Sequence, residues 1–333
     1  MTEGIRHRRL RDQYEQLLRP KRHNETTRTR YEKLRRLVVL KGIPPESSRE
    51  RSTHKSLCSL RGRIWKMLLG VRVVDAQQYV RYVHLRAPVA MQAKIEKDIL
   101  RTFKNNHDYH QRVSDGQLRR VLNAYVSWIH EGTNECANDS GSGGGEGGLY
   151  VQGMNVLAAP FLYVMNELDA YACLCRLLNH HCPQYITKDL RGAHDGALLL
   201  QTIVEYIDPE LATHLSTAYH GDWGSVTSLP TLLSLSASKP IALSELLKLW
   251  DALFACGVHM NVVFTAAHII LLRDRLLAGG HAELQAMLCI QRDLPMLDAD
   301  LLVTLSLHIV RKLPDDMYQQ LEKHPYTQAQ VVQ

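Results

Sequence analysis

The chain has 333 residues, of which 45% are apolar and 22% charged, so it can bury one large hydrophobic core or two modest ones. Its seven cysteines are an odd number at irregular positions, which argues against a disulfide framework and favours a reducing compartment. The net charge of +6 comes from residues 1–55, which hold 16 Lys and Arg against 7 Asp and Glu, whereas the remainder holds 24 against 27.

Residues 1–33 carry much of this positive charge. Arginines interrupt the first twenty residues so often that no secretory signal is predicted. We expect 1–33 to be a basic, partly disordered N-terminal arm, frayed over 1–27, that binds acidic surfaces. An α-helical nucleic-acid-binding module is an alternative, but the arm has few aromatic residues and no recognised nucleic-acid-binding fold around it. No nucleic-acid partner is therefore expected.

Helical periodicity dominates the rest of the chain. Apolar residues recur at i, i+3 and i+4, and no run of strict alternation predicts a strand, so the predicted fold is all-α. Asn261 and Asp298 are predicted N-caps, and Gly42, the Gly279-Gly280 pair and Pro314 are predicted helix ends. The predicted helical segments are 34–41, 91–104, 117–130, 155–179, 196–207, 243–256, 261–277 and 298–312.

Residues 131–148 are rich in glycine and polar side chains. Such a segment buries too little apolar surface to offset the entropy of ordering, so we expect a flexible insertion. The longest apolar run, 156–165, has ten residues, whereas about 20 are needed to span a bilayer. We therefore expect no transmembrane segment and a cytoplasmic protein. Residues 314–333 are predicted to form a C-terminal tail, frayed at 322–333.

Five potential metal ligands lie close together in the sequence: Cys173, Cys175, His180, His181 and Cys182. Zinc sites usually pair their ligands as C-x₂₋₄-C and H-x₃₋₅-H, and this spacing fits neither pattern. Cys173 and Cys175 also fall in an apolar helical pattern, where cysteine packs as a small hydrophobic residue. No metal site is predicted. The chain also lacks the G-x-x-x-x-G-K-[ST] motif, so we do not expect it to bind GTP itself.

Two short segments carry residues with catalytic potential. Arg101 lies in I-E-K-D-I-L-R-T-F, near the middle of a predicted helix, and by itself would form a surface ion pair with Asp98 worth about 0.2–0.5 kcal/mol. Gln152 lies in Y-V-Q-G-M-N, where Gly153 permits a tight turn before an apolar helix, and by itself would be a turn residue. Arginine can neutralise charge on a transferring phosphoryl group, and a glutamine amide can orient the attacking water.

Together and in this order, the two segments resemble the motifs I-x-x-D-x-x-R and Y-x-Q-G-M-N of the TBC-domain GTPase-activating proteins (GAPs). The segment R-G-R-I-W at 61–65 is similar to the R-G-x-x-W opening of that domain, and L-W-D-A-L-F at 249–254 to its W-D-x-L-F segment. The resemblance implies one multi-helix TBC domain over 34–313. One departure is 229–238, which is rich in leucine and serine where many relatives carry W-F-x-x-x-F. This variant resembles the fungal spindle-pole GAP subunits that restrain mitotic exit and septation.

The resemblance implies that Arg101 is an arginine finger and Gln152 a glutamine finger, both supplied in trans to a small, Rab-like GTPase. It implies that the chain has no stand-alone reaction and no cofactor of its own, because the partner GTPase carries GTP and magnesium. Trp65, four residues after Arg61, is interpreted mainly as a core residue. The residues expected to support the fingers are Asp98, Tyr150, Gly153, Asn155, Arg61 and Trp65.

The resemblance also implies partners and a location. A small GTPase is the expected partner, an auxiliary GAP or scaffold subunit is a second one, and the spindle pole body is the implied site within the cytoplasm. The alternative from another class is a non-catalytic scaffold, at the spindle pole or a membrane, that uses the same surface only to bind the GTPase. The presence of both finger residues favours a GAP.

Overall fold

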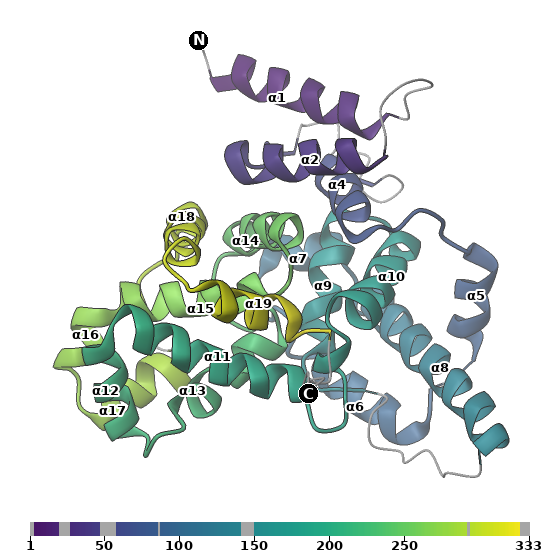
Figure 1. Cartoon of the computed structure of the whole chain (residues 1–333). Coiled ribbons are helices and arrows are strands. Elements are labelled where there is room, and N and C mark those ends of the chain that lie inside the picture. Colours follow the sequence, from purple (N-terminus) through teal and green to yellow (C-terminus); the bar gives the residue numbers. More distant parts are fainter. Residues whose placement is uncertain are drawn as a thin grey trace. The chain divides into compact units, whose positions relative to one another are not determined.

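The structure, a computed structural model, describes residues 3–19, 27–46, 58–85, 87–140, 150–291 and 294–326 (Figure 1). Every regular element within these ranges is a helix, which confirms the predicted all-α fold. The chain divides into two compact units, Met1–Asn179 and His180–Gln333, and the predicted domain 34–313 spans parts of both.

The first unit is built around α8, a long helix that packs against α5, α6, α9 and α10. A second group forms where α4 packs against α1, α2, α9 and α10. The helices of this unit are α1 (Glu3–Leu18), α2 (Thr27–Lys41), α4 (Leu60–Leu69), α5 (Ala76–His84), α6 (Val89–Ile99), α7 (His107–Arg112), α8 (Asp115–Ser140), α9 (Met154–Val164) and α10 (Glu167–Arg176). A π-helical turn, η1 (Leu177–His181), follows α10.

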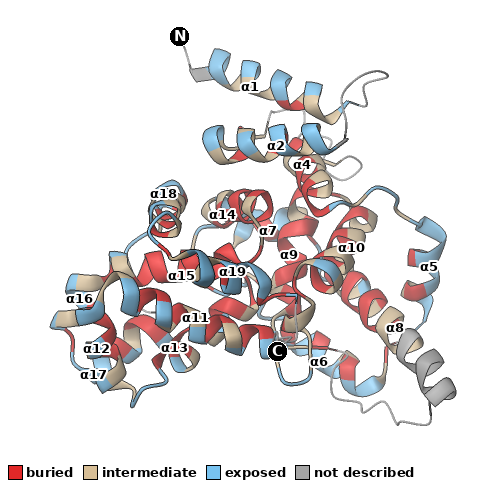
Figure 2. Cartoon of the chain, viewed as in Figure 1, coloured by how far each residue is buried: buried red, intermediate tan, exposed pale blue. Residues whose placement is uncertain are grey.

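The sequence specifies the limits of α4 clearly. The side chain of Ser59 accepts a hydrogen bond from the amide of Gly62, and Gly70 ends the helix in the left-handed conformation. Between these caps, Ile64 and Trp65 are fully buried. The helix therefore inserts its apolar side into the first unit (Figure 2).

The N-terminal segment differs from the predicted disordered arm. α1 and α2 pack against each other and against α4, and Tyr14 and Leu34 are fully buried. The hydroxyl of Tyr14 donates to the carbonyl oxygen of Gly42 at 2.7 Å, and Arg63 forms an ion pair with Glu15. The prediction for 1–33 was wrong over α1 and the start of α2, because a few apolar residues among many arginines suffice to anchor these helices.

Two further predictions in this unit need correction. The predicted insertion 131–148 begins inside α8, which runs to Ser140, and its residues 141–148 lie outside the described part of the chain. The predicted helix 155–179 is broken at Met165, and α10 starts afresh because the side chain of Asn166 accepts a hydrogen bond from the amide of Asp169. Apolar residues continue at helical spacing through this break, so their periodicity did not reveal that one helix ends there and another begins.

The second unit is centred on α11, which packs against α12, α13 and α15, while α18 packs against α14 and α15. Its elements are η2 (Pro183–Tyr185), α11 (Arg191–Ile207), α12 (Pro209–Ala218), α13 (Trp223–Leu233), α14 (Leu243–Cys256), α15 (Met260–Leu271), α16 (Arg273–Ala278), α17 (His281–Leu284), η3 (Gln285–Cys289), α18 (Ala299–Val310) and α19 (Asp315–Lys323).

The predicted helix ends of this unit have mixed outcomes. Asp298 caps α18 as predicted, because its side chain accepts from the amides of Asp300 and Leu301, and Gly279 follows the end of α16. Asn261 is not an N-cap. It lies inside α15, fully buried, where its Nδ2 donates to the carbonyl oxygen of Thr231 and its Oδ1 accepts from Ser236.

The C-terminal tail is also more ordered than predicted. α19 spans part of it, Leu321 is fully buried, and the carbonyl oxygen of Pro325 accepts a hydrogen bond from the amide of Gln184. The prediction of fraying at 322–333 was therefore wrong up to Tyr326, and residues 327–333 lie outside the described ranges.

A buried basic pair lies in the second unit. Nζ of Lys239, a residue only 9% exposed, donates to Nδ1 of His268 at 2.9 Å. Burial lowers the pKa of Lys239 from 10.5 to about 7. Burial, and then the charge of Lys239, lowers the pKa of His268 from 6.5 to about 3. Both groups therefore resist protonation in the folded chain.

The described residues contain neither a membrane-spanning helix nor a metal-binding cluster. None of the helices found there is both long and apolar enough to cross a membrane. Those residues also contain no group of three or more His, Cys, Asp or Glu side chains that could hold a metal ion. Cys173 and Cys182 are buried, and burial raises the pKa of the Cys182 thiol to about 12.

Candidate functional site

Arg101 lies in a turn and not, as predicted, within a helix. α6 ends at Ile99, and Phe103 adopts a φ of 44° in the left-handed region, where a right-handed helix cannot continue. The predicted helix 91–104 therefore stops two residues before Arg101. Arg101, the candidate finger, therefore lies just beyond the C-terminal end of α6, at an exposed position that a partner can reach.

Asp98 holds Arg101 from one side. Nε and Nη2 of Arg101 both donate to Oδ1 of Asp98, at 2.9 and 2.5 Å. The arginine side chain is 54% exposed, whereas that of the aspartate is 8% exposed. The carboxylate is thus part of the packed interior, and the guanidinium is fixed along one edge and open along the other.

The same carboxylate binds the second motif. Oδ2 of Asp98 accepts a hydrogen bond of 2.8 Å from the hydroxyl of Tyr150, which is buried. Burial, and then the negative charge of Asp98, raises the pKa of Tyr150 far above its usual value, so the hydroxyl remains a donor. One side chain therefore connects two segments that are about fifty residues apart in the sequence.

A second contact fixes the backbone around Arg101. The hydroxyl of Thr102 donates to the carbonyl oxygen of Asp98 at 2.8 Å. Nδ2 of Asn155 donates to that carbonyl at 3.2 Å and to Oγ1 of Thr102 at 2.8 Å. Asn155 was predicted to support the site, whereas Thr102 was missed. Its signal in the sequence was its position four residues after Asp98, from which a threonine hydroxyl can reach back to a helix carbonyl.

Gln152 is exposed on a glycine turn. Gly153 has a φ of 104° and directly precedes α9, and no atom lies within 4 Å of the place where a Cβ would be. Its backbone conformation, and not crowding, therefore explains the glycine. The exposed side chain of Gln152 makes no hydrogen bond with any described residue, so its amide remains available to a partner.

The two remaining predicted residues lie on α4. Trp65 is fully buried with its ring edge-on to that of Phe161 at 5.8 Å, as expected of a core residue. Arg61 is half-buried. Burial raises the pKa of Tyr163 on α9, and the charges of Arg112 and Arg61 oppose that rise, which places Arg61 near Tyr163.

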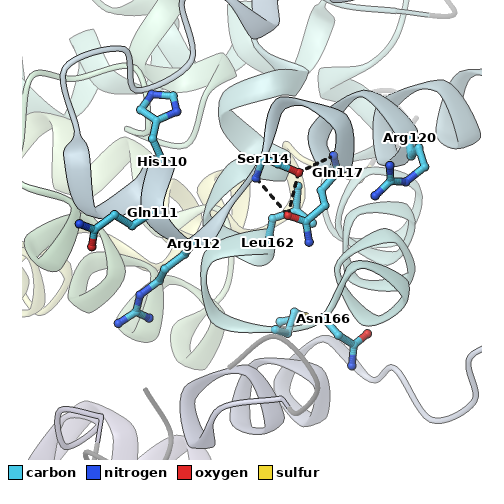
Figure 3. A pocket seen from close by; sticks show the side chains of 9 residues that line it. His110, Gln111, Arg112, Ser114, Gln117, Arg120, Leu162 and Asn166 are labelled. Carbon is cyan, nitrogen blue, oxygen red and sulfur yellow. Dashed lines mark hydrogen bonds between the residues drawn. The ribbon is translucent and has the colours of Figure 1, made fainter. Parts of the chain in front are cut away.

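A cavity of about 350 Å³ lies between α7, the start of α8 and the end of α9 (Figure 3). Its walls are mostly polar and include Arg112 and Arg120, and Ser114 and Gln117 bond to each other at its edge. Arg112 is paired with Glu46 at 2.8 Å and Arg120 with Glu167 at 2.6 Å. Because both arginines already have carboxylate partners, the cavity offers little unbalanced charge, although Nη1 of Arg112 is buried without an acceptor among the described residues.

Comparison with known proteins identifies the class. Residues 58–277 match the Rab-GTPase-TBC domain (RabGAP-TBC) family, and the chain belongs to this family of GTPase-activating proteins, whose partner is a small GTPase. Solved structures agree on the fold. The Ypt/Rab-GAP domain of Gyp1p has a TM-score of 0.59 at 17% identity, with 91% of this chain and 98% of that chain covered. A Chlamydomonas flagellar RabGAP TBC domain has a TM-score of 0.58 at 19% identity, covering 92% and 95%.

Particular relatives are more similar in sequence. The putative mitotic check point protein BUB2 of Dictyostelium discoideum is 40% identical over 88% of this chain and 74% of its own length. The cell division control protein 16 of Schizosaccharomyces pombe is 35% identical, with 88% of each chain covered. The mitotic check point protein BUB2 of Saccharomyces cerevisiae is 31% identical over 87% of this chain and 90% of its own length.

Proposed function

We propose that this chain accelerates GTP hydrolysis by a small, Rab-like GTPase by inserting Arg101 and Gln152 into the GTPase active site. The partner would bring GTP and magnesium, and this chain would supply only the two side chains. The observation that carries the proposal is the Asp98 carboxylate, which accepts hydrogen bonds from Arg101 and from Tyr150, two residues before Gln152. In an ordinary surface ion pair, Asp98 would bind Arg101 alone and would not also bind Tyr150 of the second motif.

The chemistry assigned to each finger follows from its surroundings. The exposed edge of the Arg101 guanidinium can donate to phosphoryl oxygens as negative charge develops on them, while Asp98 keeps the group oriented. An arginine supplied in trans typically accelerates hydrolysis by about 10³–10⁵-fold. The Gln152 amide, which has no hydrogen-bond partner among the described residues, can accept from and donate to the attacking water.

The relatives suggest the cellular setting. Their names refer to a mitotic check point and to cell division control. We infer that this chain restrains mitotic exit and septation, together with an auxiliary GAP or scaffold subunit, at the spindle pole body within the cytoplasm.

The arginine is tested by single-turnover hydrolysis. We expect Arg101→Ala to reduce the rate stimulated at saturating GAP by at least about a hundredfold and to leave thermal stability almost unchanged, because the side chain is half exposed. The matched control is Arg119→Ala, which breaks the exposed pair of Arg119 with Glu96 at 2.8 Å and should keep full activity. Near-normal activity of the Arg101 variant would refute the finger mechanism.

The glutamine test separates a GAP from a scaffold. Gln152→Ala should lower the hydrolysis rate far more than the affinity for a GTPase held in a transition-state mimic, because a single interface hydrogen bond changes binding by only about 1–3 kcal/mol. Equal losses of rate and affinity would identify Gln152 as a docking contact. That result would support the non-catalytic scaffold at the spindle pole or a membrane.

A further inference from the structure

The outward side of α6 leads directly to Arg101. The helix buries Met91, Ile95, Asp98 and Ile99 in the first unit, and its opposite side is exposed. On that exposed side lie Lys94 and Lys97, which are three residues apart and therefore neighbours on the helix surface. The exposed residues Leu100 and Lys104 flank Arg101 in the following turn. We call Lys94, Lys97, Leu100 and Lys104 the finger-flanking surface.

This surface carries unbalanced positive charge. The three lysines form no ion pair or hydrogen bond within the described part of the chain. The nearby carboxylate of Glu96 is already engaged, since its Oε2 accepts from Nη2 of Arg119 at 2.8 Å. The guanidinium of Arg101 is balanced by Asp98, so the surplus charge comes from the lysines.

The surface also contains an apolar side chain in an unusual place. Leu100 is 72% exposed and directly precedes Arg101. Isolated exposed leucines are common and need no explanation by themselves. Here, however, consecutive Cα atoms are about 3.8 Å apart, so exposed Leu100 lies next to any protein surface that receives the Arg101 side chain.

The size of a protein interface extends this argument to the lysines. A stable interface covers about 800 Å² on each partner, equivalent to a disc of about 16 Å radius. Lys97 precedes Arg101 by about one helical turn, on the order of 6 Å, and Lys104 follows it by at most about 11 Å of extended chain. Both therefore fall within the footprint of a partner centred on Arg101.

We propose that the finger-flanking surface docks the GTPase, with the lysines facing acidic side chains around its nucleotide-binding site and Leu100 packing into an apolar depression. This inference rests on the proposed function and specifies the partner: a GTPase whose nucleotide-site rim is acidic. The lysines act mainly on association, because exposed charges steer encounter more than they add affinity. Leu100 mainly lowers the dissociation rate constant, because the contacts of its buried side chain must be broken before the complex separates.

The test measures binding and hydrolysis separately, with the full chain and a panel of small GTPases. Binding is measured with GTPases loaded with a nonhydrolysable GTP analogue, and hydrolysis with the same GTPases loaded with GTP. We expect Lys97→Glu/Lys104→Glu to lower the association rate constant at least about tenfold at low salt, and this effect should shrink strongly at about 0.5 M salt. Leu100→Ser should raise the dissociation rate constant about fivefold or more. The maximal hydrolysis rate at saturating GAP should change less than about threefold, because both fingers remain.

Matched controls lie on α2 of the same unit. Arg36→Glu/Lys41→Glu makes the same change of charge at exposed positions, and Lys41, like Lys97, lies in the last turn of its helix. Leu40→Ser replaces a leucine that is 62% exposed. These variants should bind the GTPase like the wild type.

The outcomes distinguish this inference from the proposed function. Unchanged association in the lysine variant, or an equal loss in the α2 control, overturns the docking surface while stimulated hydrolysis still supports the GAP. Binding that depends on these residues without any stimulated hydrolysis supports the surface and refutes the GAP. Absence of binding to every GTPase of the panel refutes both.

Discussion

Asp98 is the residue on which the candidate site depends. Each of its carboxylate oxygens has a different partner: Oδ1 accepts from Arg101 and Oδ2 from Tyr150. Its backbone carbonyl accepts from Thr102 and Asn155. A buried acceptor with this many donors is costly to replace, because each donor that loses its partner retains its desolvation penalty.

We predict that Asp98→Asn reduces stimulated hydrolysis by about ten- to a hundredfold and the free energy of unfolding by about 1–3 kcal/mol. Asparagine keeps the shape of the side chain but removes the charge that orients Arg101, and its amide group cannot accept from both partners. The measurements are single-turnover hydrolysis and chemical denaturation. Glu96→Gln, which changes a half-exposed carboxylate also paired with an arginine, is the control and should alter neither quantity strongly.

At the scale of elements, the sequence predicted many of the helices but only some of their ends, such as the start of α18 at Asp298. Periodicity located α8, α11 and α14 because their apolar stripes are long and uninterrupted. It failed where a stripe continues past a break, as at Met165, or where a non-glycine residue takes a positive φ, as at Phe103. Such breaks depend on tertiary contacts, which a pattern of apolar residues does not contain.

The prediction of the candidate site had the same limit, because contacts between distant segments are not visible in a sequence pattern. Motif resemblance predicted Arg101, Gln152 and Asp98 as site residues, because each is marked by its spacing within a short segment. It did not reveal that Asp98 joins the two segments, nor that Thr102 completes the connection, because these contacts cross about fifty residues of sequence.

The largest error was the prediction of a partly disordered arm over residues 1–33, where α1 packs against α2. Charge dominated the interpretation of residues 1–33, yet several of the basic side chains there form contacts that hold the helices. Nη2 of Arg30 donates to the carbonyl oxygen of Leu17 at 2.6 Å, and that of Arg11 to the carbonyl oxygen of Pro45 at 2.7 Å. A high density of arginine is therefore compatible with a packed layer.

We predict that Tyr14→Ala lowers the free energy of unfolding by about 3 kcal/mol, because it removes a fully buried aromatic ring and a hydrogen bond to Gly42. Thermal and chemical denaturation of the full chain measure the effect. Ile5→Ala on the same helix, at a position 47% exposed, should cost much less. A disordered arm would show no difference between the two variants.

At the scale of the whole molecule, each unit has its own interior, and the second one contains the buried Lys239–His268 pair. In the unfolded chain Lys239 binds a proton with a pKa near 10.5, whereas in the folded chain this pKa is about 7. Between these values the unfolded state binds more protons, so stability rises with pH from about 7 to 10.5. The pKa of His268, lowered to about 3, adds a second window in which stability falls as pH drops from 6.5.

We predict that Lys239→Met raises the free energy of unfolding at pH 7 by about 1–3 kcal/mol and flattens its rise between pH 7 and 10. Methionine fills a similar volume without the cost of burying an ammonium group, although the bond to His268 is lost. Urea denaturation across this pH range measures both effects. Lys312→Met, at an exposed position of the same unit, should leave the pH dependence unchanged, and an equally steep profile in both variants would contradict the prediction.

The isolation of Gln152 has an evolutionary consequence. Asp98, Tyr150 and Asn155 are bound into the interior, so drift at these positions is opposed by selection for a folded protein. Gln152 has no bond to any described residue, and its loss leaves the network around Asp98 intact. A lineage could thus lose the proposed glutamine finger in one substitution while keeping the fold and Arg101 bound to Asp98. If Gln152 is a finger, one substitution at this exposed position therefore suffices to turn an active GAP into a GTPase-binding pseudoenzyme.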